Sequence, residues 1–238
     1  MKKIYFNSDE EFQNFIKNGK DLGEKKTFLV HDKVIKIFNI RGLLSSGFIH
    51  SYSNRIISNS AKLNQNGIHS LNITHQLEFI HNKRLSGVIY NHIPGIPIRD
   101  MSIKEFTKSF LKELALFLSS IHSKGIYFRA MHMGNIIYHN GNFCLIDVAK
   151  VHFYPWSLMS FTRARAYRRF IKYPKDLKTL GKNNLELLIK MYMEESKFNL
   201  LNKLIFKCTL KILMNHNYKL IKRYTLFFAI LFLIIWLI

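Results

Sequence analysis

The chain has 238 residues, 48% of them apolar, which is enough to form one domain or two small lobes around a cleft. Lys and Arg outnumber Asp and Glu by 36 to 15, and this net charge of +21 favours a polyanionic partner. No zinc-ligand spacing or helix-turn-helix signature supports nucleic acid, so we expect an anionic membrane surface or a phosphorylated substrate. Two cysteines, Cys144 and Cys208, are too few for a disulfide framework and indicate a reducing compartment. The first residues turn acidic early and do not resemble a secretory signal.

The first part of the chain is predicted to be rich in strands. Ser8 and Glu11 form a capping box in front of a short helix. Further along, alternating apolar residues predict strands, and a longer apolar period predicts a helix that ends at Gly67. The expected elements are strands at 26–30, 33–38, 76–81 and 87–90 and a helix at 52–66. Residues 91–97 contain Pro and Gly and are the natural hinge to the second part.

The second part is predicted to be mainly helical. Residues 102–120 form an amphipathic pattern that continues to His122 and stops at Gly125. A basic helix is expected at 161–173, and further helices follow Pro174. The predicted fold is a bilobal α+β fold with an N-lobe at 1–97, a helical C-lobe at 98–224 and an apolar tail at 225–238.

Residues 126–150 carry the most informative pattern. Arg129 opens a tight loop and Asn135 closes it. A strand at 136–138, an Asn-Gly turn and a second strand at 143–146 then lead to Asp147. Phosphoryl transfer requires such a layout, because a loop Asn and a strand-end Asp hold the magnesium that neutralises the developing charge. We therefore expect Arg129, Asn135 and Asp147 in a catalytic loop, with Asn135 and Asp147 as magnesium ligands.

The order of features along the chain fits a two-lobed, kinase-like fold. Lys36 lies on a strand, a helix starts at residue 52, a hinge follows at 89–95, and the loop and Asp147 come last. In this arrangement Lys36 would bind the phosphates of ATP. The residues expected to border the adenine are Tyr90, Asn91 and His92.

Three stretches resemble a bacterial family: I-H-S-K-G-I-Y-F-R-A-M-H-M-G-N-I-I, L-I-D-V-A-K and R-A-R-A-Y-R-R-F-I-K-Y-P-K-D. They resemble the toluene-tolerance proteins, kinase-like relatives of the lipopolysaccharide core heptose kinases, over roughly residues 33–176. The resemblance implies a protein-kinase-like fold and ATP- and magnesium-dependent transfer to a lipopolysaccharide core sugar, at the cytoplasmic face of the inner membrane. More distantly, the loop is similar to that of aminoglycoside and choline phosphotransferases, whose H-x-D-x-H-x-x-N motif matches His132 and Asn135.

Three parts of that machinery are missing. Ala130 stands where the phosphotransferases place the catalytic base, and residues 27–37 contain no Gly for a phosphate loop. The helix from residue 52 has no Glu to pair with Lys36, and Asn59 is its nearest polar candidate. Beside the enzyme, two alternatives therefore stay open: a pseudokinase-type binding or scaffold protein of the cell envelope, and a membrane-bound regulator without nucleotide.

His132 and the basic helix can each be interpreted as functional or as structural. His132 could replace the missing base, or it could hydrogen-bond a loop carbonyl and brace Asn135, which we favour. The basic helix could cradle the phosphate of a phosphorylated lipid or core oligosaccharide, or it could be a solvated basic face. Its candidate residues are Arg163, Arg165, Arg168, Arg169 and Lys172.

The chain ends in a wholly apolar segment at 226–238, preceded by Lys219, Lys222 and Arg223. As a helix, about 13 residues span roughly 20 Å, which is short of the roughly 30 Å hydrocarbon core of a bilayer. We expect an apolar C-terminal helix that dips into the inner leaflet, with its basic flank on anionic headgroups. A full span and a buried terminal helix are the alternatives.

Overall fold

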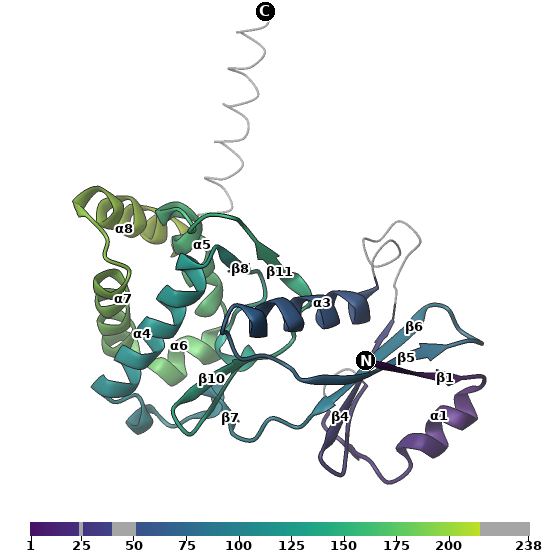
Figure 1. Cartoon of the computed structure of the whole chain (residues 1–238). Coiled ribbons are helices and arrows are strands. Elements are labelled where there is room, and N and C mark those ends of the chain that lie inside the picture. Colours follow the sequence, from purple (N-terminus) through teal and green to yellow (C-terminus); the bar gives the residue numbers. More distant parts are fainter. Residues whose placement is uncertain (24–25, 40–50, 215–238) are drawn as a thin grey trace, which may run out of the picture.

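The computed structural model describes residues 1–23, 26–39 and 51–214, which form a strand-rich N-lobe and a helical C-lobe (Figure 1). A six-stranded sheet in the order β1-β5-β6-β4-β3-β2 builds the N-lobe. Strand β1 pairs with β5 in parallel, and the other neighbours are antiparallel. The elements are β1 Lys2–Phe6, α1 Asp9–Ile16, β2 Lys20–Asp21, β3 Thr27–Val30, β4 Lys33–Asn39, α3 Tyr52–Gln65, β5 Ile73–Phe79 and β6 Leu85–Asn91.

The expected N-lobe elements are present, with small shifts at their ends, and two strands were not expected. Ser8 caps α1, since the Glu11 amide donates to Ser8 Oγ at 3.2 Å, but the predicted capping box is incomplete because Glu11 Oε2 accepts from the Asn7 amide at 2.6 Å instead of the Ser8 amide. Strands β1 and β2 had no alternating apolar pattern strong enough to predict them.

The period-two alternation of β4 decides where Lys36 lies. Ile35 and Ile37 pack with Phe12 of α1 in one core cluster. Val34 belongs to the second cluster, which includes residues of α3 and the whole C-lobe core. Since successive side chains of a strand point to opposite faces, Lys36 shares the face of Val34, toward α3 and the C-lobe.

The C-lobe follows the hinge. Its irregular segments and strands are β7 Ile96–Pro97, η1 Ile98–Asp100, η2 Ile103–Glu105, β8 Ile126–Phe128, η3 Met133–Asn135, β9 Ile136–His139, β10 Asn142–Leu145, η4 Val148–Lys150 and β11 Val151–Phe153. Its helices are α4 Lys108–Ser123, α5 Ser160–Phe170, α6 Pro174–Leu180, α7 Lys182–Glu195 and α8 Leu200–Met214. The predicted hairpin around Asn140 and Gly141 is confirmed, since β9 and β10 pair in antiparallel register on either side of this turn.

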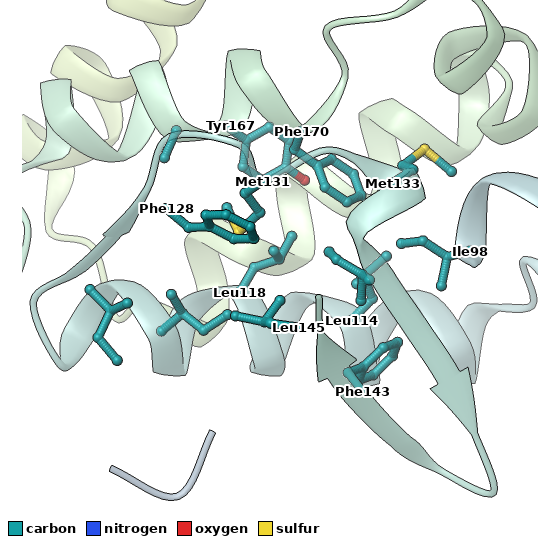
Figure 2. Packing of buried hydrophobic residues seen from close by; sticks show 14 of the residues in the cluster. Ile98, Leu114, Leu118, Phe128, Met131, Met133, Phe143, Leu145, Tyr167 and Phe170 are labelled. Carbon is teal, nitrogen blue, oxygen red and sulfur yellow. The ribbon is translucent and has the colours of Figure 1, made fainter. Parts of the chain in front are cut away.

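The loop between β8 and β9 is anchored in the C-lobe core. Met131 and Met133 are completely buried. Figure 2 shows Met131 and Phe128 between Leu118 of α4 and Tyr167 of α5. Buried side chains on both sides of the loop restrict its backbone, so polar residues between these anchors have defined positions.

Two predicted helices have different limits. Residues 102–120 are not one helix: the capping box of Ser102 starts only the short η2, and the backbone turns away at Phe106 with ψ 56°. Helix α4 starts after Thr107, whose Oγ1 accepts from the Phe110 amide at 3.3 Å. The basic helix predicted to reach residue 173 ends at Phe170, so Lys172 lies outside it.

The predicted tail at 225–238, with the end of the predicted C-lobe, lies outside the described residues, so the apolar C-terminal helix stays a prediction. Within residues 1–23, 26–39 and 51–214, no helix is both long and apolar enough to cross a membrane.

Candidate active site

The strand lysine and the strand-end aspartate, both predicted to belong to the site, lie in direct contact. Lys36 Nζ of β4 lies 3.2 Å from Asp147 Oδ1, although the two residues are 111 positions apart. The Lys36 side chain is mostly buried, and the Asp147 side chain is 43% exposed, so a ligand can still reach the carboxylate. The contact joins the N-lobe sheet to the loop segment of the C-lobe.

Asp147 has a backbone conformation that few residues tolerate. Its φ of 54° and ψ of 42° lie in the left-handed region, where Asp and Asn are enriched among residues other than Gly. The following residue, Val148, offers its carbonyl oxygen to Asn59 Nδ2 of α3 at 2.8 Å. Asn59 therefore does not take the place of the missing glutamate beside Lys36. It ties α3 to the segment that carries Asp147.

Asn135 closes the loop and is joined to the strand that leads to Asp147. Its Nδ2 donates to the Ala130 carbonyl at 2.9 Å, and its backbone carbonyl accepts from the Ile146 amide at 3.0 Å. The hairpin of β9 and β10 thus brings the end of the loop next to the end of β10. Because the amide nitrogen of Asn135 is engaged by the loop, Oδ1 is the side-chain atom that can bind a metal.

These oxygen atoms fit magnesium. Mg²⁺ in phosphotransferase sites is bound by one or two carboxylates together with water and substrate phosphates, rather than by a complete protein cage. In the part of the chain that the structure describes, no three His, Cys, Asp or Glu side chains are grouped as a metal site. Asp147 and Asn135 Oδ1 could supply two of the oxygen ligands of such a metal.

Behind the loop lies an ion pair that the sequence analysis did not identify. Arg99 of η1 bonds both carboxylate oxygens of Asp176 in α6, Nε to Oδ1 at 2.5 Å and Nη2 to Oδ2 at 3.1 Å. Asp176 is completely buried, and the Arg99 guanidinium also lies over the Tyr173 ring, 4.9 Å from its centroid. A Cβ at Gly134 would stand 2.6 Å from Arg99 Nη1, so the loop packs directly on this arginine. The partners are 77 residues apart, and no local sequence signal links them.

His132 binds this arginine rather than the loop carbonyl that we expected. Arg99 Nη2 lies 3.1 Å from His132 Nδ1, and since Arg can only donate, Nδ1 accepts. The neutral ring therefore carries its proton on Nε2. Partial burial, and next the Arg99 charge, lower the pKa of His132 below its usual 6.5. A ring with Nδ1 occupied and Nε2 protonated has no free nitrogen to take a proton, which argues against His132 as the base.

The residues predicted to border the adenine start the connection between the lobes. Tyr90 is buried in β6. Asn91 Oδ1 accepts from Lys33 Nζ at 2.6 Å, and the His92 amide donates to the Asp32 carbonyl at 2.8 Å. These contacts hold the strand end on the β3–β4 turn, and the adenine contact itself stays a prediction.

The four arginines of α5 do not form one surface. Arg163 is buried, with Nε donating to the Leu158 carbonyl and Nη2 to Ser157 Oγ, both at 2.7 Å. Arg165 is exposed. Arg163 thus has a local structural role.

The other two arginines of α5 bond carbonyl groups. Arg168 Nε donates to the Leu213 carbonyl of α8 at 3.1 Å. Arg169 Nη1 donates to the Arg129 carbonyl at 2.9 Å, which ties α5 to the start of the loop. The phosphate-binding role of these residues stays a prediction.

Comparison with known proteins identifies the fold. No family model matches the sequence, and no curated protein matches it. Among solved structures, WaaP in complex with acyl carrier protein superposes with a TM-score of 0.51 at 11% identity, covering 82% of this chain and 88% of that one. The amicoumacin kinase hAmiN in complex with AMP-PNP and Ca²⁺ gives 0.52 at 11% identity, covering 89% and 82%. The aminoglycoside phosphotransferase APH(3'')-Id of Streptomyces rimosus, in complex with ADP and streptomycin, gives 0.52 at 10%, covering 86% and 97%.

At these identities the likeness establishes the architecture. The strand-rich N-lobe, the helical C-lobe and the contact between Lys36 and Asp147 occur together in a chain that superposes on kinases over most of its length. The chain has a protein-kinase-like fold.

Proposed function

We propose that this protein is an ATP- and magnesium-dependent phosphotransferase that acts on a lipopolysaccharide core sugar in bacterial envelope biogenesis, in the manner of the toluene-tolerance proteins. The observation that carries the proposal is the 3.2 Å contact between Lys36 and Asp147. The contact brings together a lysine from an N-lobe strand and an aspartate that follows a C-lobe hairpin. Phosphoryl transfer requires both residue types in one site, the lysine to bind the nucleotide phosphates and the aspartate to bind magnesium.

Each residue has a role in this proposal. Lys36 would move from Asp147 to the nucleotide phosphates, and Asp147 and Asn135 Oδ1 would hold magnesium, which neutralises charge on the transferred group. Arg129 opens the loop, and Tyr90, Asn91 and His92 border the adenine. Arg165 and Arg169 are the better placed candidates of α5 for a phosphorylated lipid or core oligosaccharide, because Arg165 is exposed and Arg169 contacts the loop. Arg163 is a weaker candidate because it is buried, and Arg168 because it bonds the Leu213 carbonyl of α8 and not the loop.

The second candidate is a pseudokinase-type scaffold of the cell envelope. Ala130 favours it, since the position of the catalytic base has no polar side chain. A loose phosphoryl-transfer transition state depends little on a catalytic base, so an enzyme with Ala130 at this position can still transfer phosphate. Proton transfer by His132 is less attractive than we expected, because Nδ1 of its ring accepts from Arg99.

Nucleotide binding tests the site directly. A nucleotide at about 100 times its Kd stabilises a protein by roughly 2.7 kcal/mol. For a chain of this size that free energy raises Tm by about 5–10 °C. We expect ATP with magnesium to produce this shift in wild type and little shift in Asp147→Asn, which keeps a residue suited to the left-handed backbone. Asp100→Asn, an exposed carboxylate paired with Lys175, is the control and should respond like wild type. If no nucleotide raises the Tm, the enzyme proposal fails and the pseudokinase-type scaffold is the remaining candidate.

The acceptor and the location are tested in cells. Core oligosaccharide from a deletion strain should lack one phosphate by mass spectrometry, and an unchanged mass would exclude the proposed substrate. We further propose that the protein works at the cytoplasmic face of the inner membrane, with residues 225–238 in the bilayer. The full-length protein should then stay on membranes in high salt, which screens electrostatic attachment alone.

A further inference from the structure

Helix α8 has an apolar face that no described residue covers. Five of its side chains recur at intervals of three or four residues and so lie on one face of the helix. We name these residues the α8 stripe: Leu201, Leu204, Ile205, Cys208 and Ile212. Leu201 is 63% exposed and Leu204 is 58% exposed.

The rest of α8 explains why this face is available. Phe206, Leu210 and Leu213 are buried on the other side of the helix. Figure 1 shows α8 beside α5 at the outer end of the C-lobe. The apolar residues of α8 thus exceed what is needed to attach the helix to its own domain.

The start of α5 also carries exposed apolar residues. Ser160 Oγ donates to Asn202 Oδ1 at 2.8 Å, which brings the first residues of α5 and α8 together. On either side of Ser160, Met159 and Phe161 are exposed, and Trp156 in the segment before them is 58% exposed. Several exposed apolar side chains thus stand in and just before the first turn of α5, next to the start of α8 in the fold.

Positive charge borders the stripe. Lys203, Lys207 and Lys211 are spaced four residues apart and so form a row along α8. Residues 197–214 contain no Asp or Glu. A helix with an apolar face next to a row of lysines is the pattern of segments that lie in the interface of anionic bilayers.

We infer that the α8 stripe, with its lysine row, is a docking surface for an anionic lipid bilayer, on which α8 lies parallel to the membrane plane. Charge complementarity and the course of the chain favour a bilayer over other occupants. The chain continues from Met214 directly into a segment with Lys219, Lys222 and Arg223 before the apolar residues 226–238. The inference shares the membrane of the proposed function but does not rest on nucleotide binding.

The protein contains its own reporter for this surface. Cys208 lies within the stripe and is exposed, so a charged maleimide should modify it rapidly in the free protein. Burial raises the pKa of Cys144 to about 12, which keeps that thiol protonated and unreactive. The experiment measures the modification rate of Cys208 in the full chain, with and without vesicles, and identifies the modified thiol by mass spectrometry.

We expect vesicles of phosphatidylcholine with one third phosphatidylglycerol to slow the modification of Cys208 by about tenfold or more, because each Leu that enters the bilayer contributes about tenfold to partitioning. Vesicles of pure phosphatidylcholine should slow the modification of Cys208 less than the anionic vesicles do. A reporter in the N-lobe, Lys17→Cys in a Cys208→Ser background, should keep its rate in both vesicles, since residue 17 is exposed and directly follows α1, which lies far from α8 (Figure 1).

Charge and apolar variants separate the α8 stripe from the tail. Lys203→Glu with Lys207→Glu and Lys211→Glu should abolish the preference for anionic vesicles, whereas Lys2→Glu with Lys17→Glu and Lys20→Glu, the same charge change on exposed N-lobe lysines, should retain it. Leu201→Asn with Leu204→Asn should restore rapid modification of Cys208 while leaving the circular dichroism unchanged, because both side chains are exposed.

Three results would overturn the inference. If Cys208 in protein that sediments with vesicles is modified as fast as in protein without vesicles, another segment binds the membrane, for example the tail alone. If Cys208 is already slow without vesicles, a second copy or another part of the chain covers the stripe, and sedimentation velocity shows which. If the leucine variant stays protected, the stripe is not the contact surface.

Discussion

The buried ion pair between Arg99 and Asp176 should be among the most sensitive points of the molecule. The Asp176 side chain has no solvent exposure, and Arg99 meets it with two hydrogen bonds. Removing one partner of a buried pair leaves the other charge without compensation and typically costs about 3–5 kcal/mol. We expect Arg99→Met and Asp176→Leu each to lower the free energy of unfolding by about this amount. The double variant should cost much less than their sum, since it leaves no unpaired charge.

Urea unfolding of the four proteins gives the coupling energy of the pair. The chain provides a matched control one residue away from each partner: Asp100 and Lys175 form a 2.8 Å pair whose side chains are 48% and 66% exposed. Exposed pairs contribute about 0–1 kcal/mol, so the same cycle on Asp100 and Lys175 should show weak coupling. A coupling between Arg99 and Asp176 as small as the control's would refute the view that this pair supports the loop.

Three further predictions concern the same lobe. Arg99→Met should raise the pKa of His132 toward 6.5, measured by NMR titration, because the arginine charge helps to lower it; an unchanged value would contradict the contact. Burial, and next the Arg163 charge, lower the pKa of His122 to about 3, so its contribution to stability is full above pH 6.5 and is lost as pH falls toward 3. About 2 kcal/mol should disappear between pH 6.5 and 5, and this part should be absent in His122→Gln. Gly134→Ala should cost about 1–3 kcal/mol in urea unfolding, since its Cβ would meet Arg99 Nη1 at 2.6 Å; a neutral result would mean that the loop can shift at little cost.

The parts of the site with local signals were predictable from the sequence. The turn at Asn140 and Gly141 flanked by apolar residues predicts a hairpin, and the hairpin determines how far Asn135 lies from Asp147. Alternation along β4 predicts which face carries Lys36. The order of these elements predicted that Lys36 and Asp147 belong to one site, and their direct contact was learned from the structure.

The remainder depends on contacts between distant segments. Arg99 and Asp176 are 77 residues apart, and neither stands in a pattern that marks it as buried. Arg163 was a phosphate-binding candidate only as a member of the basic segment, and its guanidinium is used inside the C-lobe by the segment before α5. The amphipathic pattern predicted one helix from residue 102, but the capping box of Ser102 belongs to the short η2, and the cap at Thr107 starts the longer helix.

The parallel pairing of β1 with β5 has a consequence for biosynthesis. Strand β1 spans Lys2–Phe6, and its partner β5 spans Ile73–Phe79, so the first strand emerges from the ribosome long before its partner exists. At roughly 5–20 residues per second, the delay is about 4–15 s. During this time Phe6, which is buried in the finished lobe, has α1 as its nearest available cover. We expect slow translation between residues 7 and 79 to increase the capture of the nascent chain by chaperones, and a ribosome-bound chain ending before β5 to lack a protected β1.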